Sequence, residues 1–478
     1  MTSTFTSATT SPGSLVELGG TTWYRIDRLE RMDPFLVTVA SNSDLWLFAS
    51  STGALTLGRV DADHALLPYE TDDRLHRSAG VTGPVTVITR GEEAWRPFGA
   101  DVDPAAHRAL GKSTIGNQLF VEETHTEWGL TFRATWSPAP SYGWVRKVEL
   151  IDESGAGQRV RVLDGLVDVM PFGLEEDFES TKSNLADAYK RSETGGWGSA
   201  AVYTIEARIT DTAQPAEALA ATVVWTYGDA PTEVLLDERA IRAEVEGRPW
   251  PAADLLFGRR GSYLRRGDVE VPANGSTTWS LVGDTGLDHA EVFDRVALAQ
   301  HTGAAERVTA DIAGGVAELE RLLAGADGFQ STGDHVADAH HLSNVMSNSM
   351  RGGLLPYGMS LPIPAFLDHL ATWNRPTFEA HRDALAALGD GVTLAELHGF
   401  ARRSGDADLE RLVLEYFPLA FSRRHGDPSR PWNRFSIRVR DEAGEEVLGY
   451  QGNWRDIFQN WEALLLSHPG FASHAVAK

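Results

Sequence analysis

The sequence predicts an α+β protein of several domains, in which a large antiparallel β-sandwich is followed by a helical region. Three observations support this division. Apolar and polar residues alternate over 130–136, a period of two that is typical of a strand with one buried face. Similar runs recur up to about residue 285 without the rhythm of βαβ units, which favours an antiparallel sandwich. After Gly286 the spacing of apolar residues becomes helical.

Turn sequences separate the predicted strands of the first part. The runs 145–151 and 158–163 flank Asp-Glu-Ser-Gly-Ala-Gly at 152–157, which predicts a hairpin. Asn274-Gly275 is formally part of a glycosylation acceptor, but between two strand-like runs it predicts a second hairpin turn. Other elements expected in this part are strands at 201–209, 220–225 and 277–282 and one acidic helix at 174–190.

The second part of the chain is predicted to be helical. A helix over 334–350 has two faces, one polar and one apolar. The polar side carries His340, His341, Asn344, Ser347, Asn348 and Arg351, and the other carries Leu342, Val345, Met346 and Ser349. Other helices are expected at 291–300, 306–323, 364–373, 376–388, 393–403, 406–417 and 454–466. The predicted domains are a flexible tail (1–14), the sandwich (15–285), a helical linker (286–330) and a final helical region (331–478).

Composition excludes several classes of function. The formal net charge is −24, so the chain lacks the basic surface that binding to nucleic acid or an anionic membrane needs. The absence of cysteine excludes disulfides, thiolate nucleophiles and cysteine-ligated metals. No run of about 18 uncharged apolar residues predicts a membrane helix, and the Ser/Thr-rich start has no signal-peptide pattern. We therefore expect a cytoplasmic protein.

The terminal helix is the most informative segment. Ile457, Trp461, Leu464 and Leu465 form an apolar stripe, whereas Arg455, Asp456, Gln459, Asn460 and Ala463 form the opposite face. This polar face combines flat, fork-shaped hydrogen-bonding groups with neighbouring tryptophans. Sugar hydroxyls need bidentate polar partners, and the C–H faces of a sugar ring need aromatic surface. The alternative is an amphipathic helix whose polar side is solvated.

Other candidate sites are less specific. His340 and His341 lie about 100° apart on a helix without a clear third ligand, so lining of a polar pocket is favoured over a metal site. The carboxylates at 175–177 suit the start of a helix better than catalysis. The loop 422–433 holds three arginines, a histidine, an aspartate and a tryptophan, a set that suits phosphate or sugar hydroxyls. The alternative to a binding role for this loop is a charged surface loop that docks domains through Arg–Asp pairs. The segments 50–59 and 67–73 are also candidates for a binding loop, and the alternative is that they form two turns of the sandwich.

Together, these segments resemble the glycoside phosphorylases of glycoside hydrolase family 94, the cellobiose and chitobiose phosphorylase type. Trp454-Arg-Asp-Ile-Phe-Gln-Asn-Trp461 is similar to that family's Phe-Arg-Asp-Gln-Leu-Gln-Asp helix, whose Arg and Asp hold the donor sugar. The stretch 50–73 resembles a sandwich loop that approaches the family's active site. Closer still is a set of large bacterial proteins that share the loop 422–433 and the terminal helix. The resemblance implies that these residues bind substrate: Trp454, Arg455, Asp456, Gln459, Asn460, Arg351, Asn348 and Arg59. It implies phosphate or sugar binding by Arg423, Arg424 and His425.

The resemblance also implies an (α/α)₆ barrel and, in the complete enzyme, inverting cleavage of a glycosidic bond by phosphate or water, with no cofactor other than inorganic phosphate as the co-substrate of phosphorolysis. The chain departs from the family because it lacks the Asp-Trp-Asn-Asp motif of the general acid, so no catalytic residue is assigned, and Asp427 and Glu462 are the first substitutes to consider. Only about 145 residues follow Gly333, and a 353–448 insertion separates the two helices that match. We therefore expect an incomplete barrel and a chain that corresponds to the front part of a longer enzyme. The apolar stripe of the terminal helix must fold back on the 360–420 helices, pair with another chain or stay exposed. Of these outcomes we expect exposure of the stripe, with self-association or pairing with a downstream polypeptide. The ligand expected is a disaccharide or oligosaccharide, and the alternative function is a non-catalytic carbohydrate- or partner-binding fragment.

Overall fold

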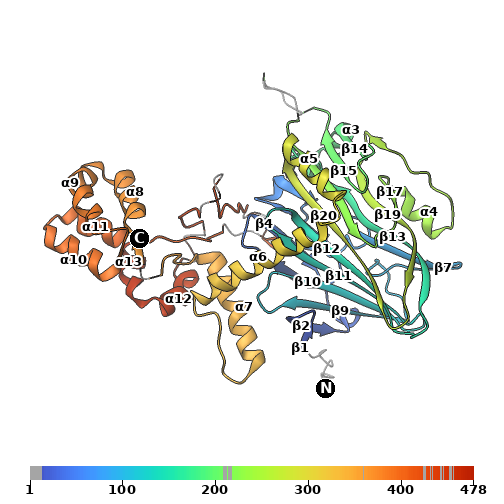
Figure 1. Ribbon diagram of the computed structural model, residues 1–478, viewed down its shortest axis with the longest axis horizontal. Coiled ribbons are helices and arrows are strands. Elements are labelled where there is room, and N and C mark those ends of the chain that lie inside the picture. The colour runs from blue at the N-terminus through green and yellow to red at the C-terminus, as the bar shows by residue number, and fades with distance from the viewer. Residues whose placement is uncertain are drawn as a thin grey trace, which may run out of the picture. The chain divides into compact units, whose positions relative to one another are not determined.

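The computed structural model divides the chain into two compact units (Figure 1). Unit 1 holds residues 1–317 and 426–437, and unit 2 holds residues 318–425 and 438–478. The structure describes residues 13–207, 213, 218–358, 360–423, 427–430, 432, 434–441, 444, 446–451, 455 and 457–478. Within this described part, no helix has the length and apolar character that a membrane span requires.

Unit 1 is built on three antiparallel sheets. The largest has eleven strands in the order β1-β2-β9-β10-β11-β12-β20-β16-β15-β14-β18. Its strands are β1 (Ser14–Leu18), β2 (Thr21–Asp27), β9 (Ala106–Ser113), β10 (Leu119–His125), β11 (Leu130–Ala139), β12 (Gly143–Asp152), β14 (Lys190–Glu193), β15 (Ala201–Ile205), β16 (Ala221–Gly228), β18 (Leu255–Phe257) and β20 (Ser276–Leu287). The predicted large antiparallel sheet domain is confirmed.

Two smaller sheets complete unit 1. A five-stranded sheet has the order β17-β19-β13-β7-β8, and a four-stranded sheet has the order β3-β4-β5-β6. Their strands are β3 (Leu36–Val39), β4 (Leu45–Ser50), β5 (Leu55–Arg59), β6 (Ala65–Leu67), β7 (Gly83–Arg90), β8 (Glu93–Trp95), β13 (Gln158–Val169), β17 (Glu233–Leu235) and β19 (Gly261–Val271). The main core joins buried residues of all three sheets, such as Phe132 of β11, Val162 of β13 and Leu57 of β5.

Helices cover the outer faces of the two larger sheets. α5 (His289–Ala299) and the start of α6 (Ala304–Ala324) pack on the eleven-stranded sheet through Val296 and Val308. On the five-stranded sheet, α4 (Arg239–Val245) packs through Ala240. The short helices of this unit are α1 (Asp72–Leu75), α2 (Glu176–Thr181), α3 (Ser183–Tyr189) and the 3₁₀ turns η1 (Leu29–Arg31) and η2 (Ala62–His64). The acidic helix expected at 174–190 is therefore two helices, broken at Lys182, which has non-helical backbone angles.

Both predicted hairpins are wrong in the same way. β12 pairs with β11 and β20, whereas β13 pairs with β19 and β7, so the turn at 152–157 crosses from one sheet to another. The Asn274 turn likewise joins β19 of one sheet to β20 of the other. The Asp152 carboxylate binds both turns, because it accepts hydrogen bonds from Ser154 Oγ at 2.5 Å and from the Asn274 backbone N–H at 3.0 Å. These hydrogen bonds hold the pKa of Asp152 far below its usual range, and the bond from Ser154 has the largest effect.

A buried ion pair connects the two larger sheets. Arg146 of β12 donates from Nη1 to both carboxylate oxygens of Asp164 on β13, at 2.8 and 2.9 Å. Trp279 Nε1 donates to Asp164 at 2.8 Å, and Thr86 Oγ1 donates to it at 2.7 Å. The side chains of Arg146 and Asp164 are 2% and 0% exposed. Since each charge is desolvated, each depends on the other for its stability in the interior.

Unit 2 is mainly helical. Its helices are α7 (His335–Gly352), α8 (Ile363–Trp373), α9 (Arg375–Ala386), α10 (Leu394–Ser404), α11 (Ala407–Glu415), α12 (Ile457–Ser467), η4 (Pro469–Phe471) and α13 (Ala472–Ala477), with a two-stranded sheet of β21 (Ser360–Pro362) and β22 (Gly391–Thr393). Capping side chains define several of the helix starts. Asp334 caps α7, Asn374 caps α9, and Thr393 with Glu396 forms a capping box on α10.

The apolar stripe of the terminal helix is buried in the core of unit 2. Ile457, Trp461 and Leu464 belong to the same cluster as residues of α8 to α11, and Leu465 packs against that cluster. Of the three outcomes for the stripe, the structure therefore has the first, packing against the 360–420 helices, and the expected exposure is wrong. The expectation of an incomplete (α/α)₆ barrel stays a prediction, because the structure shows a helical region without defining the barrel.

We predict that Asp164→Leu lowers the free energy of unfolding of unit 1 by about 3–5 kcal/mol, because it leaves the buried Arg146 guanidinium without a counter-charge. The double variant Arg146→Met/Asp164→Leu removes both charges and should recover most of the loss. Denaturant unfolding of the three proteins tests this. If the free energy of unfolding of Asp164→Leu lay within about 1 kcal/mol of the wild-type value, water would be replacing the lost counter-charge of Arg146.

Candidate functional site

The candidate site in unit 2 forms around the C-terminal end of α7. The last four carbonyl groups of a helix have no partner within the helix and must find one elsewhere. Here each has a donor. The Gly353 N–H donates to Ser349 O at 2.8 Å, and the Arg423 N–H donates to Met350 O at 2.8 Å. The other two donors are the Ser422 hydroxyl on Arg351 O at 3.4 Å and the Trp461 Nε1–H on Gly352 O at 2.9 Å.

These four donors come from three separate segments, so the end of α7 draws together the segments that the sequence singled out. The chain that follows α7 pairs with the segment before Ser422 through Leu354 and Ala420. The segment before α12 joins them, since the Gly449 N–H donates to Leu419 O at 2.7 Å and the Gln451 N–H donates to Ser422 Oγ at 3.0 Å. The segment between α7 and α12 therefore begins and ends beside α7.

Close backbone approach holds α12 against α7 (Figure 1). A Cβ atom at Gly352 would lie 2.4 Å from the Asn460 carbonyl oxygen, so the two helices fit together only because this residue has no side chain. Gly353 follows with φ +86°, a conformation that ends the helix. The Trp461 ring lies in the same contact, edge-on to Phe417 at 5.0 Å and to Tyr450 at 5.2 Å.

The two faces of α7 agree with the prediction. Leu342, Val345, Met346 and Ser349 are buried, while Asn344 and Arg351 are exposed. Asn348 is half-buried, and its Nδ2 lies 3.4 Å from Asn344 Oδ1. His340 and His341 lie on the same polar side, and the described residues include no group of three or more His, Cys, Asp or Glu side chains that could hold a metal ion.

On the terminal helix the predicted polar face is only partly present. Arg455 and Gln459 are exposed, as expected for residues that meet a ligand. Asn460 was expected on this face, and that placement is wrong. Its side chain is buried, at 5% residue exposure, and Nδ2 donates to the Tyr450 hydroxyl at 3.2 Å, because the α7 contact covers that side of the helix. Trp454 and Asp456 lie outside the described residues.

The loop 422–433 is divided between the two units. Arg423 is buried in unit 2, with its N–H on the end of α7 and its Nη1 3.4 Å from Met350 Sδ. Arg424 and His425 lie outside the described residues. Later residues belong to unit 1, where Pro428 O accepts a hydrogen bond from the Asp72 N–H at 2.9 Å and the Phe435 ring packs on Trp46 at 5.3 Å. Residues 72 and 428 both belong to unit 1, so this contact is internal to that unit, and the alternative of a loop that docks domains through Arg–Asp pairs stays a prediction.

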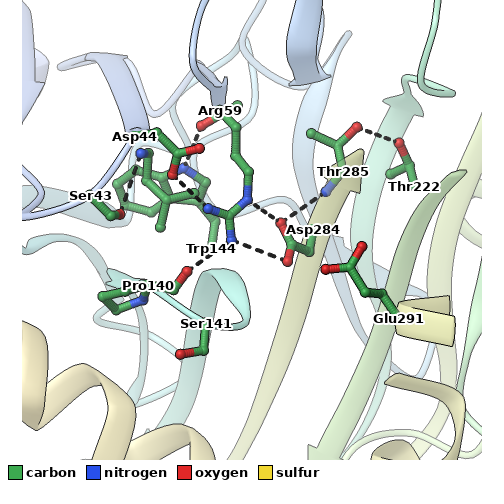
Figure 2. Close-up of polar contacts among 12 residues, drawn as sticks. Ser43, Asp44, Arg59, Pro140, Ser141, Trp144, Thr222, Asp284, Thr285 and Glu291 are labelled. Carbon is green, nitrogen blue, oxygen red and sulfur yellow. Dashed lines mark hydrogen bonds and ion pairs between the residues drawn. The ribbon is translucent and has the colours of Figure 1, made fainter. Parts of the chain in front are cut away.

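Arg59 is held by protein groups (Figure 2). Its Nε lies 2.6 Å from Asp284 Oδ1, and its Nη1 lies 2.7 Å from Asp44 Oδ1. Its Nη2 donates to Pro140 O at 3.0 Å. Burial disfavours the charged guanidinium, but Asp284 and Asp44 outweigh it and raise the pKa of Arg59. Arg59 thereby joins the four-stranded sheet to the eleven-stranded sheet, and we assign it to the structure of unit 1 and leave it out of the candidate site.

Comparison with known proteins relates one segment of the chain to a carbohydrate-active family. Residues 365–418 match the profile of glycoside hydrolase family 149 insertion domain 1. This segment holds most of α8 and all of α9, α10 and α11, and it lies inside the predicted 353–448 insertion. The family resemblance is thus supported as glycoside hydrolase-related, while membership of family 94 is not confirmed. A search of curated proteins finds no match.

Solved structures give weaker likenesses. A polysaccharide lyase matches 55% of this chain and 34% of its own at 12% identity and a TM-score of 0.29. The match to a bacterial glucoamylase complexed with acarbose covers 68% of this chain and 45% of the glucoamylase, at 9% identity and a TM-score of 0.39. The match to a putative kojibiose phosphorylase from the human microbiome covers 72% of this chain and 33% of the phosphorylase, at 8% identity and a TM-score of 0.27. The chain spans less than half the length of each, and at these scores none of their activities transfers to it.

Sequence reasoning missed the residues that build the end of α7. Gly352 and Gly353 follow the predicted helix 334–350 after one residue, and Pro356 comes three residues later, which is the pattern of a helix C-terminus. That signal was present in the sequence. The partners Ser422, Tyr450 and Trp461 come from distant segments, and no local pattern identifies them.

We predict that Gly352→Ala destabilises unit 2 by about 1–3 kcal/mol, because the new methyl group meets the Asn460 backbone and not a movable side chain. Gly314→Ala on α6 is the matched control, since no atom lies within 4 Å of its added Cβ and alanine favours a helix. Thermal unfolding should show a loss for the first variant and no loss for the second. Equal melting temperatures for the two variants would mean that α7 and α12 can separate at no cost.

Proposed function

We propose that this chain is a carbohydrate-active protein of the glycoside phosphorylase or hydrolase type, and that the end of α7 together with the start of α12 binds the donor sugar. The observation that carries the proposal is that the loop 422–433, through Ser422 and Arg423, and the terminal helix, through Trp461, meet at the end of α7. The match of residues 365–418 to an insertion domain of a glycoside hydrolase family supports it.

The exposed polar groups suit the hydroxyls of a sugar. Arg351 and Asn348 lie on the last two turns of α7, Arg455 lies two residues before α12, and Gln459 lies in the first turn of α12. Guanidinium and amide groups offer planar pairs of donors or acceptors that match neighbouring hydroxyls. The backbone beneath them is held by hydrogen bonds from Ser422, Arg423 and Trp461, so binding would cost little ordering of the chain.

The proposed reaction is inverting cleavage of a glycosidic bond by phosphate or water. A carboxylic acid would protonate the leaving oxygen while the nucleophile attacks the anomeric carbon from the opposite face. Within this scheme, Arg455 and Asp456 position the donor ring, and Arg424 and His425 receive phosphate. Arg423 contributes chiefly by holding the loop on α7, because its side chain is buried there.

The test is sugar binding by two arginine variants. We predict that Arg351→Ala and Arg455→Ala each weaken binding of cellobiose or laminaribiose about tenfold, which corresponds to about 1.4 kcal/mol. Their melting temperatures should stay close to that of the wild type, since both residues are exposed. Isothermal titration calorimetry measures the affinity, and differential scanning fluorimetry measures the stability.

Arg375→Ala on α9 is the matched control, because Arg375 is an exposed helical arginine that pairs only locally in its described contact with Glu379. It should bind sugar as the wild type does. Unchanged affinity in the Arg351 and Arg455 variants, or a fall in melting temperature with affinity unchanged, would contradict the proposal. Release of a sugar phosphate in the presence of phosphate would identify phosphorolysis. Binding without turnover would favour the alternative, a non-catalytic carbohydrate-binding protein.

A further inference from the structure

A cleft of about 300 Å³ opens at one edge of the eleven-stranded sheet in unit 1. One wall is β18, the last strand in the order of that sheet. The opposite wall is the turn from β17 into α4, and the loop 250–253 closes one side. The residues used below are Asp237, Arg239, Trp250, Leu255, Phe257 and Arg259, all of which line the cleft.

The polar side of the cleft is a carboxylate held between two guanidinium groups. Arg239 Nε lies 2.9 and 3.0 Å from the two oxygens of Asp237, and Arg259 Nη1 lies 3.6 Å from one of them. Burial disfavours the charged form of Asp237, but the hydrogen bonds from Arg239 outweigh burial and lower its pKa. At neutral pH the cleft therefore presents one anionic group between two cationic groups.

The apolar side consists of exposed aromatic and aliphatic side chains. Leu255 and Phe257 are 51% and 54% exposed, and they lie two residues apart on β18, so they project from the same face of the strand. The Arg239 guanidinium lies over the Trp250 ring, 5.0 Å from its centre. The Trp250 ring is therefore in contact with a charged group of the polar side. The Phe257 ring remains exposed in the same cleft.

Buried hydrogen bonds fix the backbone of the walls. Arg266, which is 7% exposed, donates from Nη2 to Trp250 O at 2.8 Å and is itself paired with Glu233. The Ser262 N–H donates to Leu236 O at 2.8 Å, and the Thr194 N–H donates to Asp254 O at 2.9 Å. Because all three wall segments are held from the sheet side, the cleft is formed before any ligand binds.

We propose that this cleft binds one ring of an oligosaccharide, with the C–H face of the ring on Phe257 and its hydroxyls on Asp237 and Arg259. A pyranose ring presents both kinds of surface at once, an apolar C–H face and a rim of hydroxyls. A purely apolar ligand would cover the Asp237–Arg259 pair without giving it hydrogen bonds, at a cost in desolvation. A peptide strand added to β18 would find only three residues to pair with.

The proposal goes beyond the sugar site proposed on α7 and α12, because its residues belong to unit 1 and form a second binding site of a different construction. It gives the sandwich a role in holding an oligosaccharide chain, in addition to its role as a scaffold. The two sites share no residue, so variants can silence each one separately.

The test measures binding of three hexasaccharides that differ in linkage, namely cellohexaose, laminarihexaose and maltohexaose. It uses the full chain carrying Arg351→Ala and Arg455→Ala, which removes the proposed α7 site. We expect at least one hexasaccharide to bind this protein, and we expect Phe257→Ala or Arg259→Gln to weaken that binding about tenfold or more. Phe293→Ala is the matched control, because Phe293 is 73% exposed on α5 of the same unit and away from the cleft-lining residues.

A second readout locates the ligand directly. A hexasaccharide with a photoreactive diazirine at its reducing end should crosslink to residues near 250–259, and Phe257→Ala should abolish that crosslink. Failure of all three hexasaccharides to bind the Arg351→Ala/Arg455→Ala protein at millimolar concentration would overturn this proposal and leave the α7 proposal to its own test. Binding that Phe257→Ala and Arg259→Gln leave unchanged would also overturn it.

Discussion

The organisation of unit 2 depends on how the end of α7 satisfies its backbone. Four carbonyl groups leave the last turn of any α-helix without partners, and burying them unpaired costs free energy at each one. In this protein their donors are the Gly353 and Arg423 amides, the Ser422 hydroxyl and the Trp461 indole. The last two lie 71 and 109 residues beyond their acceptors in the sequence. Satisfying one helix end therefore requires the rest of unit 2 to be in place.

This requirement explains how a long segment can lie between α7 and α12 without separating them. The segment begins at Gly353 and ends at Gly449, beside the same short stretch at Leu419 and Ala420. Helices α8 to α11 of this segment share a buried hydrophobic cluster with α12, so they hold α12 in its place against α7. The exposed residues Arg351 and Gln459 are thereby placed on helices that share a rigid contact, which is the setting that precise hydrogen bonding to a ligand needs.

Local periodicity predicted much of the fold, because it records which face of an element is buried. The two faces of α7 and the stripe of Ile457, Trp461 and Leu464 were predicted for this reason. The same pattern cannot tell which sheet a strand joins. Hence the turns at 152–157 and Asn274, which carry good hairpin sequences, cross between sheets and are organised by one carboxylate, Asp152.

Polar residues were harder to predict, since their roles depend on partners far along the chain. Arg59 pairs with Asp284, 225 residues away, and Asn460 is turned inward by the close approach of Gly352. No local pattern indicates the Arg146–Asp164 pair or the cleft around Asp237, because each is assembled from strands and turns that meet only in the folded sandwich.

Hydrogen exchange at the end of α7 tests the central claim most directly. In the free protein, we predict that the Arg423 and Gly353 amides and the Trp461 indole N–H exchange as slowly as the core amides of α8 and α11. A saturating gluco-oligosaccharide should slow exchange further at residues 422–423 and 457–460. Exchange of these groups at the rate of an open loop, with no response to the sugar, would contradict both the structural role of the α7 end and the binding site proposed on it.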